Sequence, residues 1–218
     1  MTKETIRERI EQIGIIPAIR LSSAEDALFA VEAVSNSGIP IAELTMTTPG
    51  CVEVISELAR DRPELIIGAG TIVDVEMARR CLDAGAKFLT SPGLDVRVVE
   101  FAVKHNVLVF PGALTPTEVM IAWQAGSDFV KVFPCSLLGG ASYIRALKSP
   151  FPDIALIASG GVTQTNAADF ILAGAVAVGI GGDLIPREAV HRREPSWIYE
   201  LAGRFSQIVR DARSQKAA

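Results

Sequence analysis

A lysine stands in the middle of the apolar run FVKVFP, residues 129–134, which has the composition of a buried β-strand. Successive side chains of a strand point to opposite faces, so Lys131 shares a face with Phe129 and Phe133. Burying an ammonium ion is costly, and such a lysine needs a partner charge, a route to water or a use for the neutral amine. A neutral amine among apolar side chains can attack a ketone and form a Schiff base. Position alone leaves a structural ion pair equally open.

The other lysines compete poorly for this role. Lys87 opens its strand, so we expect it at the end of the sheet opposite the reactive one. The remaining four lie in helical or terminal segments, where we expect them to be solvated: Lys3, Lys104, Lys148 and Lys216.

A carboxyl group, Glu43, stands in the apolar run IPIAELTM, residues 39–46, on the same face as Ile41 and Thr45. There it could neutralise Lys131 or move protons between carbon and water beside it. An imine-forming aldolase needs such a pair, because the iminium withdraws electrons while the carboxylate takes the proton that makes the enamine. A purely structural pair would instead keep the lysine protonated and unreactive.

Two glycine-rich turns follow the last two expected strands, ASGGVT at 158–163 and GIGGD at 179–183. In (β/α)₈ barrels the corresponding loops often bind phosphate through backbone N–H groups, and glycine lets the anion approach. Tight turns explain either motif alone, whereas the two together favour an anion site. Asp183 argues against phosphate unless its carboxylate points away.

Three further residues are placed to line the mouth of a barrel. Arg20 ends the first expected strand on the parity of Ile16 and Ala18, and could hold a carboxylate there or form a salt bridge at the rim. Thr71 and Pro92 stand at the ends of the third and fourth expected strands.

Residues of the types that bind metals, histidine and cysteine, are scattered along the sequence and form no cluster. His105 falls in the last turn of an expected helix and His191 in a charged loop. The cysteines Cys51, Cys81 and Cys135 are widely spaced and form no C-x-x-C motif. We therefore expect no metal, no cofactor and no disulfide.

Composition limits the partners of the protein. The net charge of −4 at pH 7 comes with no run of basic residues, which argues against nucleic acid. No apolar run approaches the roughly 18 residues that a membrane span needs. The N-terminus begins with mixed charges on a helical period rather than an apolar leader. We expect a cytoplasmic protein, not bound to membranes, with a small-molecule partner.

Apolar, β-branched runs alternate with stretches of helical period. The runs predict eight strands, at residues 15–21, 39–46, 65–71, 87–91, 107–112, 129–134, 154–161 and 175–182. Several helical stretches open with a Ser, Thr or Asp cap, and four close where a left-handed glycine is expected, at Gly38, Gly85, Gly126 and Gly174.

This alternation predicts an α/β fold, a single (β/α)₈ TIM barrel domain over residues 1–218, with a leading helix at about 3–13 as its N-terminal cap. The open-sheet alternative depends on GAGTIV, residues 68–73, which has the first two glycines of a dinucleotide fingerprint. Val73 takes the place of the third, and no acidic residue closes a strand about 20 residues later, which disfavours a Rossmann fold.

Six motifs occur along the chain in the order IAELTM, IGAGTI, LTSPG, VFPG, FVKVFP and SGGV. Together they resemble the 2-keto-3-deoxy-6-phosphogluconate (KDPG) and 4-hydroxy-2-oxoglutarate (KHG) aldolase family over about residues 10–185. The resemblance implies a class I, metal-free aldolase on a (β/α)₈ barrel, usually a homotrimer. Such an enzyme cleaves a 2-keto-4-hydroxy acid into pyruvate and an aldehyde, glyceraldehyde 3-phosphate from KDPG or glyoxylate from KHG.

The resemblance also implies roles for individual residues. Lys131 would form the imine and Glu43 would be the general acid and base. Thr71 and Pro92 would lie beside the pyruvate moiety, and Phe133 would wall the site. The distal end of the substrate would meet Ser159, Gly160, Gly161, Gly181 and Gly182.

One position departs from the pattern. Well-known members carry an arginine four residues after the glutamate, where this chain has Thr47. Other branches place an arginine at the end of the first strand, as Arg20 is here, so carboxylate binding is assigned to Arg20.

Several alternatives stay open. The substrate could be the galactonate epimer of KDPG or an unphosphorylated keto acid. A phosphosugar isomerase or epimerase would use Glu43 as its base, with Lys131 only electrostatic. A non-catalytic barrel would bind a keto acid or sugar phosphate without turning it over.

Overall fold

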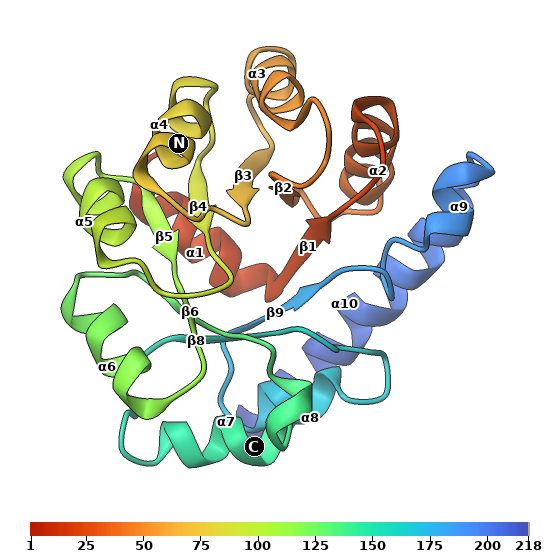
Figure 1. Cartoon of the computed structure of the whole chain (residues 1–218). Coiled ribbons are helices and arrows are strands. Elements are labelled where there is room, and N and C mark those ends of the chain that lie inside the picture. The colour runs from red at the N-terminus through yellow and green to blue at the C-terminus, as the bar shows by residue number, and fades with distance from the viewer. Residues whose placement is uncertain (218) are drawn as a thin grey trace.

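Nine parallel strands form a ring around the core, and helices cover its outside (Figure 1). The computed structural model describes residues 1–217. The strands are β1 (Ile15–Ile19), β2 (Ile41–Thr45), β3 (Ile66–Gly70), β4 (Phe88–Thr90), β5 (Leu108–Phe110), β6 (Gly112–Ala113), β7 (Val130–Val132), β8 (Leu156–Ser159) and β9 (Ala177–Ile180). They pair in the order β5-β4-β3-β2-β1-β9-β8-β7-β6. This confirms the predicted barrel.

The ring closes at Pro111, which breaks the fifth predicted strand into β5 and β6. A proline has no N–H to donate to a ladder, so the strand pairs with β4 before the break and with β7 after it. Across the gap, the carbonyls of Val109 and Pro111 accept hydrogen bonds from the N–H groups of Asp128 and Lys131. The eight predicted strands are therefore all present, one of them in two parts.

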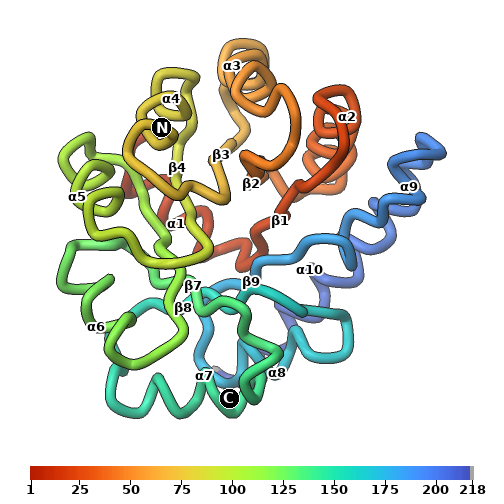
Figure 2. Tube along the Cα trace, viewed as in Figure 1, coloured from red at the N-terminus to blue at the C-terminus, as the bar shows by residue number. Residues whose placement is uncertain are grey.

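The tube in Figure 2 shows how the chain alternates between the ring and its outer layer. The helices are α1 (Lys3–Ile13), α2 (Ala24–Asn36), α3 (Cys51–Asp61), α4 (Val75–Asp83), α5 (Val96–Lys104), α6 (Pro116–Gln124), α7 (Ala141–Lys148), α8 (Ala167–Leu172), α9 (Arg187–His191) and α10 (Pro195–Ala217), with a 3-10 turn η1 (Ser136–Leu138). The four predicted C-terminal glycines all have positive φ, between +92° and +112°. No helix within residues 1–217 is both long and apolar enough to cross a bilayer.

The interior of the barrel is aromatic at the end away from the strands' carboxyl termini. The rings of Phe88 and Phe110 stack with centroids 5.0 Å apart, and Phe129 meets Phe110 edge-on at 4.9 Å. Arg7 of α1 lies over the ring of Phe129, 5.4 Å from its centroid. The predicted N-terminal helix therefore covers this end of the barrel, and the opposite end is left open for a site.

Two lysines depart from the expectation that they would be solvated. Lys3 forms a 2.8 Å ion pair with Asp128, and its side chain is only 16% exposed. Lys148 donates to the carbonyls of Pro152 and Ile154, and burial lowers its pKa. The helix ends that carry them fold back against loops, which a helical period does not reveal. Lys87 is placed as predicted, at the amino end of the strands, where it donates to the carbonyls of Pro63 and Leu65.

Arg213 of α10 ties the C-terminal helix to the closed end of the barrel. Its guanidinium donates to the carbonyls of Gln12, Glu11 and Val176 at 2.6, 2.6 and 2.8 Å. Gly14 leaves the space for it, since a Cβ at that position would lie 2.3 Å from Arg213 Nη2.

Replacing Arg213 by methionine should lower the free energy of unfolding by about 2 kcal/mol, because three carbonyls lose a charged donor. Thermal unfolding followed by circular dichroism measures the loss. The matched control is Arg210→Met, one turn away and exposed, where the same change should stay within about 0.5 kcal/mol. Equal losses in the two variants would show that Arg213 does not hold the helix in place.

Candidate active site

Lys131 and Glu43 meet inside the barrel from opposite walls. Lys131 lies on β7 and Glu43 on β2, and Nζ is 3.6 Å from Oε1. The two side chains are 11% and 6% exposed. The separation is longer than an ordinary hydrogen bond, so the amine lies near a counter-charge without being held in a short contact. The expectation that both side chains face one interior is confirmed.

Gly70 makes room for the carboxylate. Gly70 lies on β3 and pairs in the sheet with Thr45 of β2, which follows Glu43 by two residues. A Cβ on Gly70 would stand 2.1 Å from Glu43 Oε1 and 2.7 Å from its Cδ, far inside contact distance. Gly68 likewise makes room for the ring of Phe88, since a Cβ on Gly68 would lie 2.3 Å from the nearest ring atoms. The two glycines that resembled part of a dinucleotide fingerprint are therefore spaces for interior side chains.

Phe133 stands beside the amine on the same face of the chain. The Nζ of Lys131 lies 5.4 Å from the centroid of its ring, within the range of a cation–π contact. The ring therefore walls the site next to the lysine, as predicted.

A cavity of about 330 Å³ opens over this pair at the carboxyl ends of the strands. It gathers most of the predicted site residues: Arg20, Glu43, Lys131, Phe133, Ser159, Gly160, Gly161, Gly181 and Gly182. Lys131 is its one lysine among residues 1–217. Asp183 lines it too and is exposed to solvent.

Thr71 and Pro92 do not line this cavity. Thr71 follows β3 with φ of +63°, which is unusual for a β-branched residue, and its Oγ1 is 3.5 Å from Arg20 Nη2. Pro92 is exposed, and its backbone packs against Gly112, the neighbour of Lys131 in the sheet. Thr71 therefore contacts the cavity residue Arg20, and Pro92 contacts Gly112, which pairs with the cavity residue Lys131 in the sheet.

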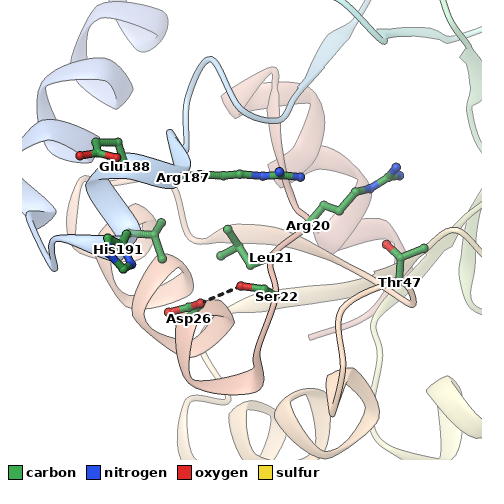
Figure 3. Close-up of a pocket in the computed structure, with 9 residues that line it drawn as sticks. Arg20, Leu21, Ser22, Asp26, Thr47, Arg187, Glu188 and His191 are labelled. Carbon is green, nitrogen blue, oxygen red and sulfur yellow. Dashed lines mark hydrogen bonds between the residues drawn. The ribbon is translucent and has the colours of Figure 1, made fainter.

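A wider pocket of about 570 Å³ adjoins the first and shares Arg20, Leu21 and Arg187 with it (Figure 3). Arg187 was not predicted, because it is an exposed residue of a short helix after β9 with no periodic signal. Neither Arg20 nor Arg187 forms an ion pair with any residue of the described chain, so the rim salt bridge considered for Arg20 is not present.

The remaining candidates for chemistry lie apart from the lysine. His191 ends α9 and lines the wider pocket, so its placement in a loop was wrong: the charged segment folds as a helical turn. The three cysteines are buried, and burial raises the pKa of Cys51, Cys81 and Cys135 to about 12, 11 and 12. At neutral pH these thiols are protonated and unreactive. Within residues 1–217, no three His, Cys, Asp or Glu side chains gather as metal ligands would.

Comparison with known proteins agrees with this geometry. Residues 6–201 match the family described as "KDPG and KHG aldolase". The chain belongs to this family. It is 32% identical to the 2-dehydro-3-deoxy-phosphogluconate aldolase of Treponema pallidum over 205 residues, 94% of this chain and 98% of that protein.

Two solved structures extend the likeness to three dimensions. One, titled "Native KDPGal structure", has a TM-score of 0.85 and 31% identity, covering 92% of this chain and 96% of its own. The KDPG aldolase of Legionella pneumophila, with pyruvate captured as a covalent carbinolamine intermediate, has a TM-score of 0.84 and 29% identity, covering 90% of this chain and 95% of its own. The relatives support a carbon–carbon lyase.

Gly70→Ala should lower turnover of the family's keto acids at least about tenfold, because the new methyl group displaces the carboxylate of Glu43. Steady-state pyruvate release measures it. Gly203→Ala makes the same change in open space on α10 and should leave turnover unchanged. Full activity in Gly70→Ala, with the fold intact by circular dichroism, would mean that the position of Glu43 is unimportant.

Proposed function

We propose that this protein is a class I aldolase that cleaves a 2-keto-4-hydroxy acid, with KDPG as the leading candidate, into pyruvate and an aldehyde. The observation that carries the proposal is the buried pair of Lys131 and Glu43, 3.6 Å apart in one cavity. The carbinolamine reported for the Legionella relative requires an amine at the site, and Lys131 is the amine that this cavity offers.

In the proposed reaction the neutral amine of Lys131 attacks the keto carbon, C2, and gives a carbinolamine. Loss of water leaves an iminium. Removal of the proton from the C4 hydroxyl breaks the C3–C4 bond, which releases the aldehyde and sends the electron pair into the iminium as an enamine. Protonation of the enamine at C3 and hydrolysis of the resulting imine release pyruvate and restore the lysine.

Glu43 is the group placed to carry the protons of these steps. It is the one acid in the cavity that lies beside Lys131, and Gly70 lets its carboxylate lie against the wall of the barrel. Arg20 and Thr71 approach each other at the mouth, where they would hold the substrate carboxylate through a charged donor and a hydroxyl.

The galactonate epimer of KDPG is a second candidate substrate, since one of the most similar solved structures is titled as KDPGal. Pyruvate release from the two epimers in parallel assays separates the candidates. We also propose that the protein needs neither metal nor cofactor, works in the cytoplasm as a single barrel domain and assembles as a homotrimer.

Borohydride should inactivate the protein irreversibly only when pyruvate is present, because reduction traps the iminium as a stable secondary amine. Peptide mass spectrometry should find the added mass on Lys131. Lys131→Met should abolish the labelling, while Lys104→Met, an exposed lysine of α5, should retain it. Labelling at another residue, or none, would refute the imine at Lys131.

Glu43→Gln should lower turnover by about 10² to 10⁴, because an amide of the same shape cannot carry the proton. Trapping of pyruvate on Lys131 should persist, since the amine remains. The matched control is Glu57→Gln on the exposed face of α3, which should turn over normally. If Glu43→Gln kept normal turnover, the carboxylate would be a structural partner of the lysine and no more.

A further inference from the structure

We propose that Thr90 is a positioning residue for Glu43, to which its hydroxyl donates a hydrogen bond once Lys131 has bonded to the substrate. The inference extends the proposed function and rests on it. Thr90 is the last residue of β4 and is 1% exposed. Its Oγ1 has no hydrogen-bond partner within residues 1–217. Buried hydroxyl groups nearly always have a partner, so this one points to a contact that forms in another state of the site.

The side chain of Thr90 faces the inside of the barrel. Phe88, two residues earlier on β4, stacks its ring on Phe110 in the aromatic layer. Side chains two residues apart on a strand share a face, so Thr90 lies one level nearer the open mouth than Phe88. Thr90 does not line the cavity over Lys131. It therefore acts on a substrate in that cavity through a neighbouring residue.

That neighbour is Glu43. The strands β2, β3 and β4 lie side by side in the ring (Figure 1). Ala69 of β3 pairs with Leu89 of β4, so the next residues of the two strands, Gly70 and Thr90, are neighbours as well. The carboxylate of Glu43 lies over Gly70, which has no side chain to stand between it and Thr90. Neighbouring strands are about 4.8 Å apart, a distance that rotation of the glutamate side chain covers.

Formation of the imine takes hydrogen-bond donors away from Glu43. In the resting site Nζ of Lys131 lies 3.6 Å from Oε1 of Glu43, and as an ammonium ion it carries three N–H groups. An iminium nitrogen keeps one of them. The carboxylate, whose side chain is only 6% exposed, then needs another donor from the protein.

Thr90 has the hydroxyl that is free to replace them. The hydroxyl of Thr45, on the same face of β2 as Glu43, is already used, since it donates to the carbonyl of Ile19 at 3.0 Å. The backbone of Thr90 is held in place, because its carbonyl accepts a hydrogen bond from the N–H of Ile72 at 3.1 Å. Its hydroxyl then donates to one carboxylate oxygen of Glu43 and leaves the other directed at the substrate.

The alternative is that Thr90 only fills space, as a valine of the same shape would. The unpartnered hydroxyl would then cost folding free energy and serve no purpose. The two explanations differ in what they expect of Thr90→Val. Space filling predicts full activity, whereas positioning predicts slower proton transfer in a protein that is folded as well as wild type.

The test separates proton transfer from imine formation, with pyruvate as the substrate of both. Exchange of the pyruvate methyl protons with deuterated water, followed by NMR, breaks a C–H bond at C3. Glu43 takes the proton, the electron pair enters the iminium to give the enamine, and the reverse step returns a deuteron. Thr90→Val should slow this exchange about tenfold, the effect of losing one hydrogen bond to a charged group. Trapping of pyruvate on Lys131 by borohydride should persist.

Three further variants identify the cause. Thr90→Ser keeps the hydroxyl and should exchange within about threefold of wild type. Ser127→Ala should exchange as wild type does, since Ser127 Oγ is also buried without a partner but precedes Asp128, which pairs with Lys3 at the closed end. In the Glu43→Gln background, Thr90→Val should change the residual rate by less than about twofold, because the hydroxyl acts through the carboxylate.

Unchanged exchange in Thr90→Val would overturn the role of Thr90. An equal loss in Thr90→Ser would assign the effect to shape, and an equal loss of trapping and exchange would show a distorted site; either would overturn it too. In these cases pyruvate is still trapped on wild type and the aldolase proposal stands. If wild type were neither trapped nor active in exchange, the aldolase proposal and the role of Thr90 would fall together.

Discussion

Burying Lys131 beside Glu43 is the constraint on which the rest of the structure depends. Two charges leave water together, and removing either partner of such a pair typically costs about 3 to 5 kcal/mol because the other is left uncompensated. The pair spans the barrel, since β2 and β7 lie four strands apart in the ring. Its geometry therefore holds only if the whole ring is closed and rigid, with the aromatic layer of Phe88, Phe110 and Phe129 filling the space beneath it.

The interior of the site could be predicted from the sequence because strands have a strict period of two. Once the apolar runs are recognised as barrel strands, parity places Lys131 and Glu43 on the inner face without further information. The same period assigned Arg20 to the mouth. What parity does not give is the space that a side chain needs. Gly70 was therefore considered only as part of a dinucleotide fingerprint, and its role in admitting the carboxylate was missed.

Residues beyond the strand ends were predicted less well, since their places depend on how loops fold back. Arg187 enters the site only because the segment after β9 turns its short helix toward β1. Thr71 and Pro92 stand at the predicted strand ends but do not line the cavity. The ion pair of Lys3 and the carbonyl contacts of Lys148 are likewise tertiary, so a helical period alone left both as solvated.

At the mouth of the barrel, Arg20 at the end of β1 lies close to Thr47 in the loop after β2. Pairing of Ala18 with Glu43 places Arg20 beside Thr45, two residues before Thr47. Arg20 and Thr47 line the same wider pocket (Figure 3). An arginine at the end of β1 therefore reaches the space that an arginine at position 47 would fill from the loop after β2. Lys131 and Glu43 are fixed by the walls of the barrel, whereas Arg20 and Asp183 lie at its rim, where substitution leaves the core unchanged. In the proposed mechanism, substrate choice would therefore depend on rim residues such as Arg20 and Asp183, and the bond-breaking step on Lys131 and Glu43 in the ring beneath them.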